Sequence, residues 1–310
     1  MNIFGAGLAG LLAGNMFRRF KPTLHEAQKK LPNNHGALLR FRTDKVGTAC
    51  AIPFKKVKVQ KAIKYDGKII TEPNLFLSNL YSQKVTDSIL SRSINNLDPV
   101  ERYIAPWELI NMMAKNCHIY KESHLDMKAI EHLNENKLPT ISTIPMPALM
   151  KIVGWKDIPE FDSKKIWTQK GKLSKPDCNV YQTIYYPDPL TPYYRISIIG
   201  NIVISEFIIE PPEMIGPHIF NVLYEDFGIR ATEINELEQS HQKYGKIKPI
   251  NEALRKQFIY EMTTKYNIYS LGRFATWRQL LLDDVVEDCQ HIEKFIDSNY
   301  NRLMQQLERK

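Results

Sequence analysis

The residues with the clearest chemical pattern are glycines near the start of the sequence. They match G-x-G-x-x-G over residues 5–10, and Gly14 extends the pattern. At a strand–turn–helix junction, the first glycine permits a tight turn, the second lets the backbone approach a pyrophosphate, and the third lets the helix pack closely. The N–H groups at the helix start would then face the phosphates. The residues expected to bind them are Gly5, Gly7, Leu8, Ala9 and Gly10.

The surrounding pattern supplies the elements that this turn needs. Residues 2–5 are predicted to form a strand, residues 8–20 a helix and residues 22–26 a second strand. Glu26 ends that strand about 20 residues after the glycines, where an acid binds the ribose hydroxyls of an adenosine. The motif therefore predicts an adenine dinucleotide. NAD fits this motif alone, whereas its N-terminal position and the fourth glycine favour FAD.

A second segment with chemical potential lies near the end of the chain. A predicted strand ends at Gly272 and Arg273, and a helix begins near Asp283, with Asp283 or Asp284 as its cap. A second helix N-terminus could direct N–H groups at the flavin or its ribityl chain. The alternative is a plain strand–turn–helix with a surface arginine.

These motifs resemble those of UDP-galactopyranose mutases, a family of FAD enzymes. The C-terminal flavin motif of that family is similar to G-R-x-x-x-Y-R followed by an aspartate, and residues 185–197 resemble its sheet motif. With the glycine pattern, the resemblance covers about half of the chain and implies non-covalently bound FAD. The cofactor-binding residues that it implies in this segment are Gly272, Arg273, Trp277, Arg278 and Asp283.

The sequence departs from the family at the substrate-binding positions. Trp277 stands where the family has a tyrosine that contacts the substrate's diphosphate. Tyr194 and Ile198 stand where it has a threonine and a glutamate. The resemblance therefore implies the scaffold and the flavin but not the sugar-nucleotide substrate.

A second resemblance is to small flavoproteins of bacteriophages, through residues 35–41 and the GRFATW segment. Some of these are linked to thymidine hypermodification, in which a flavin enzyme isomerises an N-linked glycyl group to a C-linked one. The formal net charge of +8 and the pI of about 9.1 suit a duplex DNA substrate. The alternative is a well-solvated basic surface.

Three residues are candidates for catalysis. His35 lies in a loop that resembles one beside the flavin, and an imidazole exchanges protons near neutral pH. Arg195 sits in a β-rich run, where its planar fork would bind a carboxylate or phosphate. Tyr185 belongs to a cluster of tyrosines that would line a substrate pocket. The alternatives are a structural histidine, an exposed arginine and tyrosines of the core.

Basic residues elsewhere allow two interpretations. Arg40 is expected to contact the flavin diphosphate or a substrate phosphate, as is Arg42, and either could instead form a surface ion pair. Residues 54–64 are lysine-rich and predicted to form a strand, with Lys56 and Lys58 on one face. That face would bind along a phosphate backbone. Alternatively, the lysines would protect the edge of a sheet from pairing with another chain.

The remaining pattern predicts an α/β protein. A Rossmann-like FAD domain is expected from residues 1–45, 135–160 and 265–310, with a basic strand and helical insertion over 46–134 and an antiparallel-sheet substrate domain over 161–264. Helices are predicted over residues 74–97, 106–117, 126–134, 251–266 and 283–309. Strands are predicted over residues 139–145 and 267–271 and in two or three runs within 180–209.

Several classes of function are disfavoured. The cysteines lack metal or disulfide spacing, and no H-E-x-x-H occurs, so no metal is expected. No apolar run reaches 18 residues, which predicts no membrane span. No second G-x-G-x-x-G marks a separate NADPH domain.

Reduced thiols suggest a cytoplasmic protein, in the host cytoplasm if viral, and the oligomeric state stays open. The cysteines are Cys50, Cys117, Cys178 and Cys289.

The sequence thus favours an FAD-dependent enzyme that catalyses an isomerisation or redox rearrangement. The preferred substrate is an amino-acid-modified thymidine in phage DNA, of the N-linked to C-linked glycyl type. The alternatives are a mutase acting on a free sugar nucleotide, a flavin amine oxidase and a flavin-binding module without turnover.

Overall fold

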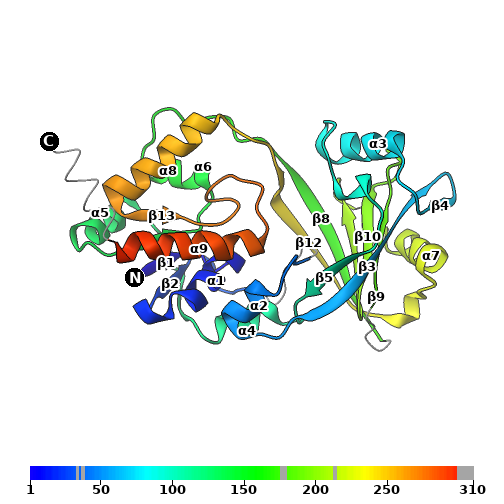
Figure 1. Ribbon diagram of the computed structural model, residues 1–310, viewed down its shortest axis with the longest axis horizontal. Coiled ribbons are helices and arrows are strands. Elements are labelled where there is room, and N and C mark those ends of the chain that lie inside the picture. The colour runs from blue at the N-terminus through cyan, green and yellow to red at the C-terminus, as the bar shows by residue number, and fades with distance from the viewer. Residues whose placement is uncertain (33–34, 36–38, 175–179, 212–214, 299–310) are drawn as a thin grey trace.

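The protein forms two lobes joined by long strands (Figure 1). The computed structural model describes residues 1–32, 35, 39–174, 180–211 and 215–298. One lobe contains a five-stranded parallel sheet and the other an eight-stranded sheet that is mostly antiparallel. The expected combination of α/β fold, parallel sheet and antiparallel sheet is therefore confirmed. Among the described residues, no helix is long and apolar enough to cross a membrane.

The parallel sheet carries the glycine pattern at its centre. Its strand order is β13-β7-β1-β2-β6, and every neighbouring pair is parallel. β6 falls within the range 46–134, which we expected to lie outside the nucleotide-binding unit, yet it pairs with β2. The strands are β1 (Asn2–Phe4), β2 (Thr23–Glu26), β6 (His118–Lys121), β7 (Thr140–Ser142) and β13 (Ile268–Ser270).

Helices cover both faces of this sheet. Successive side chains of a strand point to opposite faces, so Ile3 packs in one core with α1, α2, α4 and α9, and Phe4 packs in another with α5, α6 and α8. The result is a three-layer arrangement. The helices are α1 (Leu8–Met16), α2 (Lys45–Cys50), α4 (Leu109–Ala114), α5 (Met127–Glu135), α6 (Met146–Ile152), α8 (Glu252–Tyr266) and α9 (Leu282–Asp297).

The second sheet has the order β12-β8-β11-β10-β9-β3-β4, and β5 also pairs with β3. Only β3 and β9 run parallel. α3 (Leu75–Thr86) packs on one face, and α7 (Ile215–Phe227) covers the other. The strands are β3 (Lys55–Tyr65), β4 (Lys68–Ile70), β5 (Val100–Ile104), β8 (Ser163–Leu173), β9 (Val180–Tyr185), β10 (Tyr193–Ile199), β11 (Ile202–Phe207) and β12 (Ile234–Ile247).

Several expected elements differ from the observed ones. The helix expected over 74–97 ends at Thr86, and only a 3₁₀ turn, Ser93–Asn95, follows. A similar turn, Arg18–Phe20, ends the helix expected over 8–20. α9 is described to Asp297, and residues 299–310 of the expected final helix lie outside the described residues, as does Cys178.

The lysine-rich strand forms where expected, but it is not an edge strand. β3 pairs with β9 on one side and with β4 and β5 on the other. Lys56 forms an ion pair with Glu101 at 2.9 Å, and Lys64 forms one with Asp226 at 2.7 Å. Acids on neighbouring elements therefore offset part of this basic stretch, and edge protection does not explain it.

A buried lysine fixes the turn between β9 and β10. Lys84 of α3 is 8% exposed, and its Nζ lies 2.6–2.9 Å from four oxygens that share its three N–H donors. These are the carbonyl oxygens of Tyr186, Asp188 and Tyr193 and the hydroxyl oxygen of Thr191. The ammonium thereby replaces the water that these oxygens would otherwise bind.

We predict that Lys84→Met lowers the free energy of unfolding by about 2 to 4 kcal/mol, because buried oxygens lose their donor. Urea unfolding followed by circular dichroism measures the change. The matched variant Lys164→Met removes an exposed ion pair with Asp87 and should cost less than about 1 kcal/mol. Equal stability of the two variants would contradict the assigned role of Lys84.

Candidate functional site

The glycine turn is shaped by close packing at two of its positions. Gly5 has a φ of +95°, which favours glycine. A Cβ on Gly10 would lie only 1.8 Å from the carbonyl oxygen of Gly5. A Cβ on Gly7, in contrast, would meet no atom within 4 Å. Gly5 and Gly10 are therefore required by the fold, whereas Gly7 borders open space.

That open space adjoins the N-terminus of α1. Gly7 is the cap residue, no side chain caps the helix, and its first turn contains no acidic residue. The first N–H groups of a helix have no partner within the helix and carry its positive dipole end. The turn thus presents the amides of Leu8, Ala9 and Gly10 in an arrangement that binds anions.

Glu26 closes the turn from the second strand. Its Oε2 accepts a hydrogen bond from the Ala6 amide at 2.8 Å, and its Oε1 accepts one from the Gln28 amide at 2.9 Å. Each carboxylate oxygen keeps acceptor capacity for a hydroxyl group. Thr143, which the sequence patterns do not reveal, donates its hydroxyl to the carbonyl oxygen of Phe4 at 2.9 Å.

The C-terminal motif packs directly on this turn. Gly272 has a φ of +88°, and a Cβ there would lie 2.7 Å from the Cβ of Ala9. Arg273 follows, and its Nη2 donates to the carbonyl oxygen of Gly245 at 3.2 Å. Its Nε is buried without a partner among the described residues. Burial lowers the pKa of Arg273.

Two other residues of this motif have structural partners. Trp277 is 2% exposed, and its indole N–H donates to the carbonyl oxygen of Lys248 at 2.9 Å. Its ring meets that of Phe161 edge-on. Arg278 forms an ion pair with Asp288 at 2.5 Å. Trp277 therefore lies in a core, not at an open surface.

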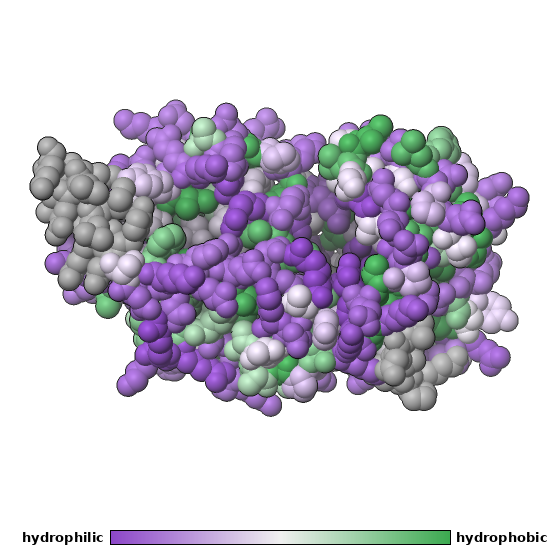
Figure 2. All heavy atoms as spheres, in the orientation of Figure 1, coloured by the Kyte–Doolittle hydropathy of each residue, from purple (hydrophilic) through white to green (hydrophobic). Residues whose placement is uncertain are grey.

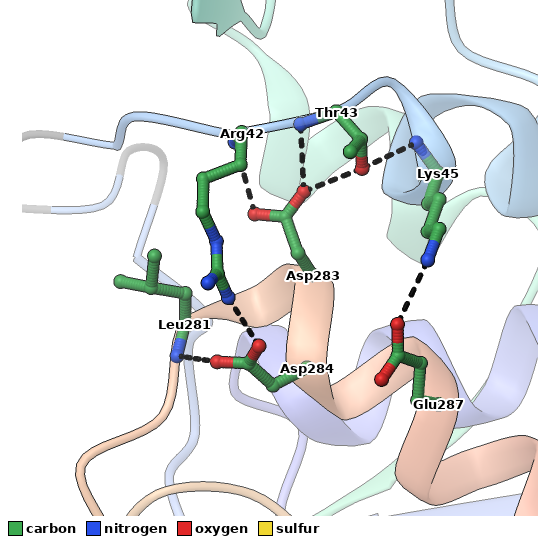
Figure 3. A network of polar contacts seen from close by, with 7 residues as sticks. All are labelled: Arg42, Thr43, Lys45, Leu281, Asp283, Asp284 and Glu287. Atoms are coloured by element: carbon green, nitrogen blue, oxygen red, sulfur yellow. Dashed lines mark hydrogen bonds and ion pairs between the residues drawn. The ribbon is translucent and has the colours of Figure 1, made fainter.

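Asp283 anchors the segment that leads from the loop of His35 to α2 (Figure 3). It is 4% exposed and accepts hydrogen bonds from the Thr43 amide at 3.0 Å, the Thr43 hydroxyl at 2.7 Å and the Arg42 amide at 3.3 Å. Asp284 pairs with the Arg42 side chain and accepts from the Leu281 amide. Asp284 thus caps α9, while Asp283 fixes the incoming chain.

Arg195 belongs to a buried polar cluster on the second sheet. Its Nη2 lies 2.7 Å from Oε1 of Glu206, and its Nε also binds that carboxylate. The Tyr194 hydroxyl donates to the same Oε1 at 2.9 Å. Burial alone would raise the pKa of Glu206, but the Arg195 guanidinium lowers it. Arg195 is therefore a partly buried ion-pair partner of the buried Glu206, not an exposed strand arginine.

Tyr185 belongs to the same sheet, and Arg40 packs against it from a loop. Tyr185 is fully buried, and its hydroxyl donates to the Ser93 hydroxyl oxygen at 3.0 Å. Arg40 donates to the hydroxyl oxygens of Ser197, at 3.0 Å, and of Thr183. The structure thus places Arg40 against β9 and β10 and not beside the glycine turn.

His35 lies at another part of the sheet. Its carbonyl oxygen accepts a hydrogen bond from Lys170 at 3.2 Å, and the Lys170 ammonium lies 4.0 Å from the centre of the Trp107 ring. These residues and several isoleucines line a cavity of about 40 Å³. Lys170 pairs with Ile204, two residues from Glu206 along β11, and the neighbours 33–34 and 36–38 of His35 lie outside the described residues.

Three further cations act on the Arg195 cluster, and of these the sequence patterns singled out only Arg273. Arg92, Lys246 and Arg273 all interact electrostatically with the Arg195–Glu206 region. Figure 2 shows a hollow between the two lobes, where Figure 1 places the approach of β8 and β12 to the first lobe. Within the described part of the chain, no three acidic, histidine or cysteine residues group as a metal site.

The fold matches solved structures over nearly the whole chain. One is a reduced UDP-galactopyranose mutase, with a TM-score of 0.67, 14% identity and 95% coverage of both chains. Another is an oxidoreductase from Methanosarcina mazei, with a TM-score of 0.54, 9% identity and coverage of 94% of this chain and 99% of that chain.

A third similar structure is a flavoprotein/dehydrogenase from Cytophaga hutchinsonii, with a TM-score of 0.52, 12% identity and coverage of 96% and 78%. The amino-acid sequence itself matches no family model and no curated protein. At these identities the likeness shows the fold alone. The chain therefore shares a fold with flavoproteins and oxidoreductases.

We predict that Asp283→Asn lowers the free energy of unfolding by about 2 kcal/mol, because charge-assisted hydrogen bonds to Arg42 and Thr43 are weakened in a buried place. Urea unfolding measures the loss. Glu287→Gln, which removes an exposed ion pair with Lys45 in the same network, should remain close to the parent protein. Equal effects of both substitutions would refute the anchoring role of Asp283.

Proposed function

We propose that the protein is an FAD-dependent enzyme that catalyses an isomerisation or redox rearrangement of an anionic substrate. The observation that carries this proposal is the open space beside Gly7, bordered by the uncapped start of α1. A pyrophosphate needs this combination, since its oxygens must come close to backbone amides.

The described residues fit FAD at both ends of the motif. The amides of Leu8, Ala9 and Gly10 would hold the pyrophosphate, and Glu26 would accept hydrogen bonds from the ribose. Arg273, whose buried Nε has no described partner, would face the cofactor from the C-terminal turn. Bound FAD would supply an electron sink, while the protein positions the substrate and its protons.

The substrate would bind against the second sheet, where cations predominate. Arg195 uses Nε and Nη2 for Glu206, which leaves Nη1 without a partner among the described residues. Lys246 Nζ lies 5.4 Å from the centre of the Tyr194 ring, and the charges of Arg92 and Arg273 act on the same amine. A phosphate or carboxylate would be stabilised by this excess of positive charge.

Within this class, we favour an amino-acid-modified thymidine in duplex DNA over a free sugar nucleotide. The net charge of +8 suits a polyanion. Trp277, which replaces the family's diphosphate-binding tyrosine, is buried and bonded to Lys248, so it offers no such contact. Glu101 forms an ion pair with Lys56 and so offsets its positive charge. We therefore infer that the substrate would bind beside Arg195 and not along the lysine-rich strand.

We predict that Gly7→Ala and Gly10→Ala fail in different ways. The Gly7 variant should fold normally, because its methyl group enters open space, yet bind FAD at least about tenfold more weakly, a loss of about 1.4 kcal/mol. The Gly10 variant should unfold at a lower temperature, because its methyl group meets the Gly5 carbonyl. Fluorescence titration with FAD and thermal unfolding distinguish them. Unchanged FAD affinity of the Gly7 variant would contradict the proposed cofactor site.

We further predict that duplex DNA containing the modified thymidine binds with an affinity that falls steeply with salt, as expected when phosphates displace counterions. Fluorescence anisotropy at increasing salt concentrations measures this slope, and nucleoside analysis of the DNA detects rearrangement. Negligible, salt-insensitive binding together with turnover of free sugar nucleotides would favour the mutase alternative.

A further inference from the structure

Lys246 is placed in the site by an irregularity of β12. The pairing of β12 with β8 shifts between Gln242 and Lys246, which marks a β-bulge. A Cβ on Gly245 would lie 2.4 Å from a side-chain carbon of Ile166, so the bulge needs glycine there. The Gly245 carbonyl also accepts the hydrogen bond from Arg273. Bulges redirect side chains, and this one places Lys246 next to the C-terminal motif.

The amine of Lys246 faces the Arg195 cluster without an acidic partner of its own. Its Nζ lies 5.4 Å from the centre of the Tyr194 ring, on β10. Lys246 is half-buried, and it forms no ion pair with any described residue. Neighbouring lysines differ, because Lys164 pairs with Asp87 and Lys248 pairs with Asp162.

Charged groups from four elements act on this amine. Burial lowers the pKa of Lys246, Arg195 of β10 lowers it further, and Glu206 of β11 opposes them. Arg92, before the 3₁₀ turn Ser93–Asn95, and Arg273, after β13, also lower the pKa, which reaches about 7. The one carboxylate in the group is already shared by Arg195 and Tyr194.

We propose that Lys246 takes up a proton when an anionic group binds beside Arg195, so that substrate binding brings a transferable proton into the cleft. This inference rests on the proposed function, because it concerns the same substrate site. A dianion would place negative charge next to an amine that otherwise faces three guanidinium groups. The charged form of the amine would then be favoured. The proton comes from solvent, and Lys246 changes from NH₂ to NH₃⁺.

The direction of the pH effect follows from this uptake. Below pH 7, Lys246 is already protonated in the free protein, and the anion binds with full affinity. Above pH 7, each bound anion must bring a proton with it, so the affinity falls by up to about tenfold per pH unit until the pKa of the complex is reached. Sulfate is a suitable probe because it remains a dianion throughout this range.

The test is calorimetric titration of the flavin-loaded protein with sulfate at pH 8 and low ionic strength, in two buffers with different ionisation enthalpies. We expect an uptake of about half a proton or more per sulfate. Lys246→Met should abolish the uptake, and Lys246→Arg should bind sulfate with no uptake and no pH dependence. The matched variant Lys248→Met should behave like the parent protein.

Lys170 provides the sharpest rival explanation. Burial lowers its pKa to about 8, and it lies elsewhere on the sheet against Trp107. Lys170→Met should therefore keep the uptake. The inference is overturned if the parent protein takes up no proton, or if the uptake survives in Lys246→Met; its loss in Lys170→Met would then assign the proton to Lys170.

The flavin absorbance of the same samples separates this inference from the proposed function. A protein that holds flavin and binds sulfate without proton uptake contradicts only the role of Lys246. A colourless protein that takes up no flavin contradicts the proposed function, whatever the sulfate titration shows.

Discussion

The close packing of the glycine turn against its own strand and against the C-terminal turn is the constraint on which the structure depends. Gly10 has no room for a side chain because the Gly5 carbonyl occupies it, and Gly272 meets Ala9 in the same way. These contacts bring two segments that are more than 250 residues apart into one site. They leave the start of α1 open beside Gly7, and they place Arg273 where it binds the backbone of β12. The proposed cofactor site and the sheet proposed to bind the substrate are thereby linked through a single turn.

The second sheet contributes Arg195 and Lys246 to a group of cations that also includes Arg92 and Arg273. Glu206 satisfies part of Arg195 and the hydroxyl of Tyr194, but it is shared among too many cations to neutralise them. The chain also crosses between the lobes near Arg40, and Asp283 holds that crossing against α9. An anion beside Arg195 would thus be attracted by Lys246 of the same sheet and by Arg273, which follows β13 of the other sheet. This arrangement suits a substrate that must be held beside a cofactor while a proton is moved.

Local patterns in the sequence predicted the elements whose signal is local. The glycine turn, the strand ending at Glu26, the lysine-rich β3 and helix α8 all form close to their predicted bounds. β8 and β12 were not predicted as strands. β12 is largely exposed and polar, and it shows no alternation of apolar residues. Glu206 and Lys246 could not be assigned for another reason: their roles arise from pairing between distant strands and from a bulge at Gly245. Trp277 matched a flavin motif, yet its burial depends on Phe161 and Lys248, which no motif includes.

The most direct test of the account is to release and identify the small molecule bound to the purified protein. The visible spectrum is recorded first, and the protein is then unfolded and the released cofactor is identified by mass spectrometry. We expect an oxidised or reduced flavin and about one FAD per chain, without a covalent bond to the protein. A protein that contains no FAD and takes up none when refolded in its presence would contradict the account.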